Sequence, residues 1–329
     1  MVIWDLENFW NEKMKKYYLP FEKPLREIDF EIDSFNSFQS DQEGNNHLII
    51  KKNEIEKSVF SNLSSWETVQ LARHPNRPYT LDYINDWSTD FIELHGDKAF
   101  ADDHAVVAGI GSIDGLKLAI IGQQKGRNTK ENIFRNFGMM KPEGYRKALR
   151  VMKIAEKFKL PILTLIDTPG ADPGIAAEER GQGFAIAKNL FEMASLKTPI
   201  LSVVIGEGAS GGALGIGLCD KMLMLEHTWF SVISPEGCAS ILWKDSQKAP
   251  DAAEALKLTP RDLVELNICD KIIFEPVGCA HRNFEETSKI LKKSILEEFR
   301  LWNEKRDMNF DFLSSRVERY SALGIFNES

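Results

Sequence analysis

The sequence has few cysteines and no long apolar run. Its four cysteines, Cys219, Cys238, Cys269 and Cys279, stand far apart and include no CxxC pair. This spacing argues against a zinc ribbon and against a disulfide framework, and it predicts buried thiols in a reducing compartment. No apolar stretch approaches the roughly 18 residues of a membrane span, and the N-terminal residues lack the basic start and apolar core of a secretory signal. We therefore expect a cytoplasmic protein with no metal of its own and no membrane-spanning segment.

An excess of basic charge is also missing. The chain has 41 Lys and Arg against 49 Asp and Glu, which gives a net charge of −8 and a pI near 5.5. Because contact with nucleic-acid phosphates requires a basic face, this balance argues against general nucleic-acid binding. With 43% hydrophobic and 27% charged residues over 329 positions, the composition is that of a globular chain of one large or two ordinary domains, and disordered and fibrous classes are excluded.

The sequence does contain a glycine-rich turn between two apolar runs, in the stretch from Pro199 to Glu226. The β-branched run from Ile200 to Ile205 leads into GEGASGG, which is followed by small residues and a second apolar run. This order predicts a strand, a turn, a short helix and another strand. Because glycines at the start of a helix leave backbone N–H groups free to face a ligand, the turn predicts a binding site for negative charge.

Two chemistries that use a cofactor or a side chain are compatible with this turn. Gly206, Gly208 and Gly211 satisfy the GxGxxG pattern of dinucleotide-binding units, and an acidic residue follows about twenty residues after the first glycine. The same turn satisfies GxSxG, the pattern of a nucleophilic serine. In that case Ser210 would be the nucleophile, and an acid and His281 would complete the triad.

A third chemistry requires no side chain. The N–H groups around Gly211 and Gly212 would form half of an oxyanion hole for an enolate. Glycines that serve only the packing of a tight turn are the alternative without a catalytic role. The turn by itself leaves these possibilities open.

The remaining pattern is that of an α/β chain. Apolar runs around Asp114-Gly115 predict a β-hairpin over residues 105–122, and further strands are expected at 161–166, 228–233 and 271–274. Helices are expected at 64–74 behind a capping box, at 81–95, from 142, for about twenty residues from 176, at 252–258, at 260–266 and from about 285. The apolar stripe of the last helix is expected to pack either on its own domain or against another subunit.

A second glycine-rich turn, DTPGADPG at residues 167–174, follows the predicted strand at 161–166. Two buried strands thus each end in a glycine-rich turn that opens a helix, and we expect both turns on one edge of a sheet, where α/β proteins bind ligands. A basic loop precedes this region and contains Lys125, Arg127 and Arg135. These cations are expected either to pair with phosphates or a carboxylate, or to be solvated surface charges.

Six segments, in order, give the chain a resemblance to a known family: HPNRPYTLDYI, FIELHGDKAFADD, IGQQKGRNTKENIFRNFGMMKPEGYRKALR, IDTPGADPGIAAEERGQGFAIAKNL, VIGEGASGGALGIG and SVISPEGCASILWK. From Ser64 to about His281 the chain closely resembles the alpha subunits of bacterial acetyl-CoA carboxylase carboxyltransferases. The resemblance implies an α/β fold, a crotonase-like ββα spiral with an N-terminal helical arm and C-terminal amphipathic helices. The implied division is an arm at 1–62, a carboxyltransferase core at 63–280 and a C-terminal helical segment at 281–329.

The resemblance also implies a reaction and partners. The family transfers the carboxyl group of carboxybiotin, held on a biotin carboxyl carrier protein, to acetyl-CoA, and so forms malonyl-CoA for fatty acid synthesis. The implied cofactor is biotin carried by the partner and not attached to this chain. The other implied partners are biotin carboxylase and a beta subunit that bears a zinc ribbon, in an α2β2 heterotetramer. A serine hydrolase and a non-catalytic structural subunit remain as alternatives.

The resemblance assigns site residues by the match to VIGEGxSGGA. It places the biotin-side oxyanion hole at the backbone of Gly211 and Gly212. The residues implied to line the biotin side are Gly170, Ala171, Gly208 and Ser210.

One residue departs from the family's pattern. The second turn usually reads DTPGAYPG, and here Asp172 stands in the aromatic position. A carboxylate cannot stack on biotin, and it would repel an anion that develops in a water-poor site. Because Pro173 and Gly174 favour an exposed turn, we expect Asp172 to point into solvent; the alternative is a weakened site.

Overall fold

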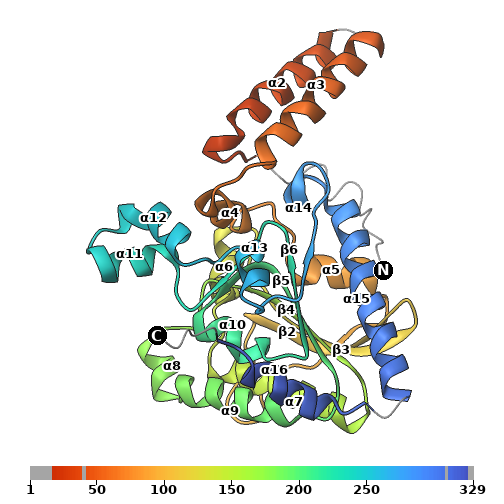
Figure 1. The fold of residues 1–329 in the computed structure, drawn as a ribbon, viewed down its shortest axis with the longest axis vertical. Coiled ribbons are helices and arrows are strands. Elements are labelled where there is room, and N and C mark those ends of the chain that lie inside the picture. Colours follow the sequence, from red (N-terminus) through yellow and green to blue (C-terminus); the bar gives the residue numbers. More distant parts are fainter. Residues whose placement is uncertain (1–16, 39–41, 308–309, 325–329) are drawn as a thin grey trace, which may run out of the picture.

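A computed structural model describes residues 17–38, 42–307 and 310–324. At its centre lies an eight-stranded mixed sheet in the order β1-β2-β3-β4-β5-β6-β8, with β7 paired to β5 (Figure 1). The strands are β1 Ile92–Glu93, β2 Val106–Ile113, β3 Leu116–Gln123, β4 Ile162–Thr168, β5 Ile200–Ala209, β6 Lys221–Leu225, β7 Trp229–Ser231 and β8 Lys271–Ile273. The helices, with 3₁₀ turns marked η, are η1 Pro20–Glu22, α2 Lys23–Phe38, α3 Gln42–Phe60, α4 Ser65–Ala72, α5 Thr80–Trp87, α6 Thr129–Phe134, η2 Asn136–Gly138, α7 Pro142–Lys157, α8 Ile175–Glu179, α9 Gln182–Ser195, α10 Ser210–Gly217, α11 Pro235–Trp243, η3 Ser246–Lys248, α12 Ala249–Ala255, α13 Pro260–Glu265, α14 Cys279–Arg282, α15 Phe284–Asp307 and α16 Phe312–Ser321.

The predicted hairpin opens the sheet. β2 and β3 pair antiparallel along their whole length, from Val106↔Gln123 to Ile113↔Leu116. Asp114 and Gly115 both have positive φ, 47° and 83°, as a two-residue hairpin turn requires. From β3 onward the strands β4, β5, β6 and β8 run parallel to their neighbours. Parallel strands need crossovers, which α7, α9 and α10 provide between β3 and β6.

Helices cover both faces of the sheet, and the side chains of β4 alternate between the two layers. Ile162 and Ile166 pack with α7, α9 and α10, whereas Leu163 and Leu165 pack with α5 and α15. The apolar stripe of α15 lies in the second layer and is buried there, at Leu291, Ile295, Phe299 and Trp302. The stripe therefore packs on its own domain. Each such side chain contributes about 1.5–3 kcal/mol to the stability of the fold, because its apolar surface leaves water.

The described part of the N-terminal region is a helical hairpin. α2 and α3 lie side by side and project away from the sheet (Figure 1). Arg282 of α14 joins this hairpin to the core, because its guanidinium bonds Asp29 Oδ2 at 2.6 Å and Glu56 Oε1 at 3.1 Å. Residues 1–16 of the predicted arm and 325–329 of the predicted C-terminal segment lie outside the described residues.

Two predicted helices have different bounds in the structure. The helix expected to reach residue 95 ends at Trp87, because Ser88 is extended and the Asp90 carboxylate accepts hydrogen bonds from Ser112 in β2. The chain then forms β1, which pairs with β2. The long helix expected from residue 176 is divided into α8 and α9, because Gly181 has φ 81° and interrupts the helix.

Two predictions concern the whole chain, namely its cysteines and membrane-spanning segments, and the described residues bear on both. The four cysteines are free and buried, as predicted. Among residues 17–38, 42–307 and 310–324, no helix combines the length and the apolar character that a bilayer crossing demands.

Candidate active site

Both glycine-rich turns lie at the carboxyl ends of neighbouring parallel strands. β4 and β5 pair from Ile162↔Ile200 onward, and after a shift in register their last pair is Thr168↔Gly208. The DTPGADPG turn follows β4 and leads to α8, and the GEGASGG segment passes from β5 directly into α10 at Ser210. The prediction that the two turns share one edge of the sheet is therefore confirmed.

The two turns contact each other through their backbones at Gly212. A Cβ atom on Gly212 would lie 2.3 Å from the carbonyl carbon of Gly170 and 2.6 Å from the nitrogen of Ala171. No side chain fits in that space, so glycine at 212 allows α10 to begin directly against the Gly170–Ala171 turn. Gly170 itself has φ 147°, a conformation that residues with a side chain rarely adopt.

The first turn of α10 presents backbone donors at this contact. No side chain caps the helix, since the N-cap residue is Ala209, and the first N–H groups of a helix have no acceptor within it. Gly211 is half-buried, and a Cβ there would meet only the Ile186 side chain, with Cδ1 at 3.4 Å and Cγ2 at 3.8 Å. Helix geometry thus leaves the amides of Gly211 and the buried Gly212 without an acceptor inside the helix, and the helix dipole favours negative charge at this end.

The earlier glycines of the motif have another role. Gly206 and Gly208 belong to the buried strand β5 and not to the turn. A Cβ on Gly208 would lie 2.5 Å from the ring of Phe230, and one on Gly206 would lie 2.3 Å from Asp167 Oδ1. Gly208, predicted to line the biotin side, thus packs against β7. A dinucleotide fold would instead use these glycines in the phosphate-binding turn.

A buried chain of charges lies beneath the two turns. Lys125 Nζ bonds Asp167 Oδ1 at 2.6 Å and Glu207 Oε2 at 2.7 Å. Arg73 Nε bonds the other oxygen of Glu207 at 2.6 Å and pairs with Glu236. Asp167 and Glu207 are almost completely buried at the ends of β4 and β5, so the ion pairs connect the two strands where the turns begin.

The protonation of these groups follows from their mutual contacts. Burial alone would lower the pKa of Lys125, but the facing carboxylates Asp167 and Glu207 raise it above its usual value. Burial opposes ionisation of Glu207, yet Lys125 and Arg73 hold its pKa below the usual value. At Asp167 burial prevails over Lys125, and the pKa is raised. Lys125 and Glu207 therefore form a charged pair at neutral pH.

The other two cations of the basic loop, Arg127 and Arg135, also contact groups of the same polypeptide. Arg127 forms an ion pair with Asp82, bonds the carbonyls of Pro75 and Arg77, and lies 4.0 Å from the centroid of the Tyr79 ring. Arg135 Nη1 bonds the carbonyl of His104 at 3.0 Å. Lys125 and Arg127 therefore pair with carboxylates, which was one of the alternatives expected for this loop. These carboxylates belong to the chain itself.

Asp172 differs from the expectation of a solvated carboxylate. It is half-buried, its Oδ1 accepts a hydrogen bond from the Gly174 N–H at 2.7 Å, and its Oδ2 accepts one from Asn136 Nδ2 at 3.0 Å. The short Asp side chain can bond the backbone two residues on, which a Tyr cannot do. The carboxylate thus stabilises the turn that contains Gly170 and Ala171.

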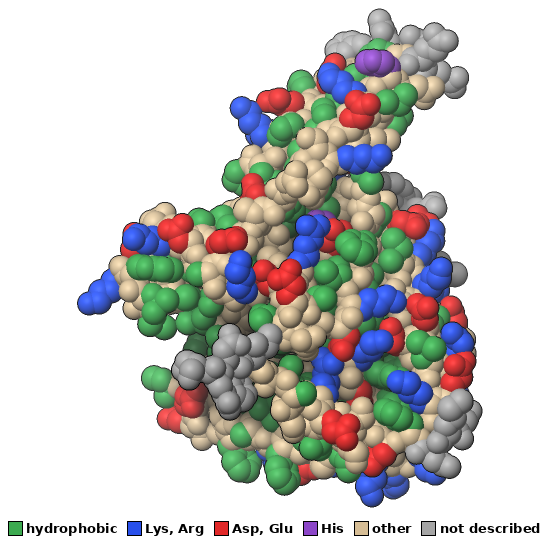
Figure 2. Space-filling view, in the orientation of Figure 1, with side chains coloured by type: hydrophobic (Ala, Val, Ile, Leu, Met, Phe, Trp, Pro, Cys, Tyr) green, Lys and Arg blue, Asp and Glu red, His purple; other side chains and the backbone are tan. Residues whose placement is uncertain are grey.

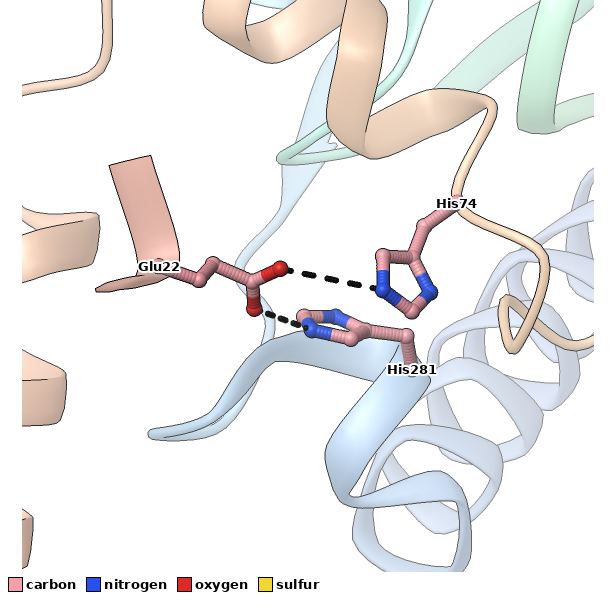
Figure 3. A group of neighbouring side chains, drawn as sticks. All are labelled: Glu22, His74 and His281. Atoms are coloured by element: carbon pink, nitrogen blue, oxygen red, sulfur yellow. Dashed lines mark hydrogen bonds and ion pairs between the residues drawn. The ribbon is translucent and has the colours of Figure 1, made fainter. Parts of the chain in front are cut away.

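The pairing that a serine hydrolase needs is not formed. Ser210 has φ 56°, which resembles the strained turn of a nucleophile, but the candidate base His281 is bonded elsewhere. Its Nε2 lies 2.8 Å from Glu22 Oε1 at the junction with the N-terminal hairpin, and its ring lies 4.2 Å from that of His74 (Figure 3).

The group of Glu22, His74 and His281 has the residue types of a metal site, and its hydrogen bonds argue for another role (Figure 3). Asn76 N–H donates to His74 Nδ1 at 3.1 Å, so the ring proton sits on Nε2, which faces Tyr17 O at 3.3 Å and Glu22 Oε2 at 3.7 Å. A protonated nitrogen has no lone pair for a metal. Burial lowers the pKa of His74 to about 3, so the ring stays neutral. The cluster is a buried connection between the hairpin and the core.

Sequence reasoning missed two residues beneath the turns. Gln123 is fully buried at the end of β3, and Glu207 is almost fully buried within the glycine motif itself. The available signal was a polar residue close behind an apolar run, near the end of a predicted strand, because a buried polar group at that place must find partners.

Comparisons with known proteins extend over nearly the whole chain. Residues 18–324 match the family described as acetyl co-enzyme A carboxylase carboxyltransferase-like. The chain is 57% identical over 284 residues to the acetyl-coenzyme A carboxylase carboxyl transferase subunit alpha of Marinomonas sp. (strain MWYL1), covering 85% of this chain and 90% of that protein. It is 51% identical over 319 residues to the subunit of the same name from Actinobacillus succinogenes, covering 94% and 99%.

Solved structures share the fold at much lower identity. Transcarboxylase 12S, crystallised with methylmalonyl-coenzyme A and methylmalonic acid, has a TM-score of 0.54 at 17% identity and covers 77% of this chain and 43% of its own. The beta subunit of P. aeruginosa geranyl-CoA carboxylase has a TM-score of 0.52 at 16% identity, over 81% of this chain and 47% of its own. These likenesses confirm the predicted α/β fold of the crotonase-like carboxyltransferase type. Because the family match runs from residue 18 to 324 and the relatives are matched over nine-tenths or more of their length, the chain belongs to the family of acetyl-CoA carboxylase carboxyltransferase alpha subunits.

Proposed function

We propose that this chain supplies the biotin-side oxyanion hole of a carboxyltransferase that moves the carboxyl group of carboxybiotin to acetyl-CoA and gives malonyl-CoA for fatty acid synthesis. The observation that carries the proposal is the backbone contact between Gly212 and the Gly170–Ala171 turn, beside the uncapped first turn of α10. A flat ureido ring can approach backbone amides only where no Cβ intervenes, and Gly211 and Gly212 provide such a surface.

The chemistry explains why backbone donors suffice. Carboxybiotin supplies the carboxyl group and a ureido anion that can accept the α-proton of acetyl-CoA. The amides of Gly211 and Gly212 donate hydrogen bonds to the oxygen on which this negative charge develops. Each well-aimed donor lowers the barrier by about 2.7–4 kcal/mol, so two donors explain a large acceleration without a side-chain base. The Gly170–Ala171 turn forms the neighbouring wall and excludes water, and Ser210 lies beside the donors without acting as a nucleophile.

Exposed apolar side chains near the site support a partner subunit. Ile175 and Phe184 of α8 and α9 are largely exposed, and so are Val232 and Ile241 beside and within α11. Figure 2 shows hydrophobic side chains on the projecting lobe that α11 and α12 form. Such apolar patches on a chain of this composition mark a protein interface. In this proposal the beta subunit covers them in a cytoplasmic α2β2 assembly, and it supplies the second oxyanion hole and the zinc ribbon.

Reconstitution tests this function. The purified chain alone is expected to give no malonyl-CoA from acetyl-CoA, because it holds donors for only one of the two anions. Mixed with its beta subunit, biotinylated carrier protein, biotin carboxylase, ATP and bicarbonate, it is expected to form malonyl-CoA. Turnover by the chain alone, or no turnover by the assembled mixture, would contradict the proposal.

A further inference from the structure

The side chain of Gln123 connects the two glycine-rich turns. It stands at the end of β3 and is fully buried. Its Nε2 donates a hydrogen bond to the carbonyl oxygen of Gly212 at 2.8 Å, and its Oε1 accepts one from the N–H of Asp167 at 3.0 Å. One amide thus contacts the first turn of α10 and the end of β4.

The orientation of this amide is fixed. If it were flipped, its oxygen would face the Gly212 carbonyl and its NH2 group would face the Asp167 N–H, so both contacts would become repulsive. Burial removes water as an alternative partner, and a buried polar group that loses its partner is costly. The two hydrogen bonds of Gln123 therefore fix the position and orientation of Gly212 relative to the end of β4.

Asp167 extends the connection to β5. Its Oδ1 accepts a hydrogen bond from the N–H of Glu207 at 3.0 Å and contacts Lys125 Nζ at 2.6 Å. Beyond Asp167, the chain enters the turn of Gly170, whose N–H donates to Thr168 Oγ1 at 3.2 Å; the Thr168 hydroxyl lies 2.7 Å from the carbonyl oxygens of both Gly138 and Gly170 and donates to one of them. Hydrogen bonds thus join α10 to Gln123 and Gln123 to the Asp167 backbone, and the adjacent Thr168 continues the connection to the turn that α10 contacts.

We propose that Gln123 is a positioning residue for carboxyl transfer, and that its amide sets the donors of Gly211 and Gly212 relative to the Gly170–Ala171 turn. This inference rests on the function proposed above, in which those donors stabilise the ureido oxygen. Oxyanion holes accelerate reactions because their donors are fixed before charge develops. A small displacement of the first turn of α10 would weaken that effect while the surfaces that bind coenzyme A and the carrier stay in place.

The test uses the complex of this chain with its beta subunit, assayed by carboxyl transfer from malonyl-CoA to free biotin. Gln123→Glu keeps the acceptor for the Asp167 N–H but sets a carboxylate oxygen against the Gly212 carbonyl, and Gln123→Met removes both bonds. Both variants are expected to lower kcat by roughly 10- to 100-fold, the effect of misplacing catalytic groups by up to about 1 Å, with KM for malonyl-CoA unchanged.

The neighbouring Gln124 provides a matched control. Its Oε1 accepts from Leu81 N–H at 2.9 Å and its Nε2 donates to the Lys125 carbonyl at 2.8 Å, so it makes the same number of backbone contacts, but to α5 and its own loop. Gln124→Met is expected to lower the melting temperature about as much as Gln123→Met and to leave kcat unchanged.

A pH profile separates positioning from packing. The buried carboxyl group of Gln123→Glu becomes neutral as the pH falls, and its O–H can then donate to the Gly212 carbonyl as the native amide does. The kcat of Gln123→Glu relative to the wild type is therefore expected to rise on acidification, whereas that of Gln123→Met stays constant.

Three results would overturn the inference. The first is wild-type kcat in both Gln123 variants, and the second is an equal loss of kcat in Gln124→Met. The third is failure of both Gln123 variants to assemble while Gln124→Met assembles, which would show a structural role only. The proposed function fails separately, if the wild-type complex does not transfer carboxyl groups to biotin.

Discussion

The complex that carries Gly212→Val is expected to lose at least about 10²-fold in kcat for carboxyl transfer, the cost of losing one oxyanion donor. Any Cβ at this position would lie 2.3 Å from the carbonyl carbon of Gly170, so α10 and the neighbouring turn must move apart. The donors then point away from the oxygen that they stabilise. Steady-state kinetics with biotin and malonyl-CoA measure the loss, and gel filtration confirms that the variant still assembles with the beta subunit.

Two neighbouring variants serve as controls for this result. Gly211→Ala is expected to lose less kcat than Gly212→Val, because its Cβ would meet only the Ile186 side chain, at 3.4 Å and 3.8 Å, and so leaves α10 against the Gly170–Ala171 turn and hinders only the approach of the ureido ring. Ser210→Ala is expected to be mild as well, because the hydroxyl is not a nucleophile in this account. An equal loss in Ser210→Ala and Gly212→Val, with assembly intact, would restore the hydrolase alternative.

Lys125→Met is expected to lower the free energy of unfolding by about 3–5 kcal/mol, since removing one partner of a buried ion pair leaves the other charge uncompensated. Here two carboxylates, Asp167 and Glu207, lose the same cation, whose Nζ lies within 2.7 Å of both. Urea unfolding measures the change. Lys289→Met is a matched control, because the pair of Lys289 with Glu285 is exposed and screened by water, so its loss is expected to change the free energy of unfolding little.

The deficit of Lys125→Met also depends on pH. Without Lys125, burial raises the pKa of Asp167 in the folded protein further above that of the unfolded chain, whereas Glu207 keeps its ion pair with Arg73. Groups with a raised folded pKa contribute stability at low pH and lose it as the pH rises through that pKa. The difference from wild type is therefore expected to shrink on acidification towards pH 5. A difference that is the same at pH 5 and pH 8 would contradict the assigned ion pairs.

Local sequence patterns predicted the strands and turns that surround the site well. Each glycine-rich turn, the strand before it and the hairpin at Asp114-Gly115 depend on residues next to one another in the chain, and sequence periodicity reports such contacts. The shared edge of the two turns followed from the same patterns, because parallel strands end on one side of a sheet. The family resemblance added the chemistry, which the turn alone left open.

Contacts between distant residues were beyond local patterns. Gln123 bonds Asp167 and Gly212, which lie 44 and 89 positions further on. His281 matched a possible triad in sequence order, but Glu22, 259 positions away, holds its ring at the hairpin junction. Gly212 has no room for a Cβ and Gly211 does, and this difference also depends on the distant turn at Gly170. Such pairings require the register of β4 against β5, which includes an irregular shift.

In the proposed function, the backbone amides of Gly211 and Gly212 bind the ureido oxygen of biotin. A crystal structure of the alpha–beta complex with biotin would show this contact. We expect the ureido oxygen about 2.7–3.1 Å from the nitrogen atoms of Gly211 and Gly212, with the ring against the Gly170–Ala171 turn. Biotin bound with its ureido oxygen directed at a side chain, or at another edge of the sheet, would contradict it.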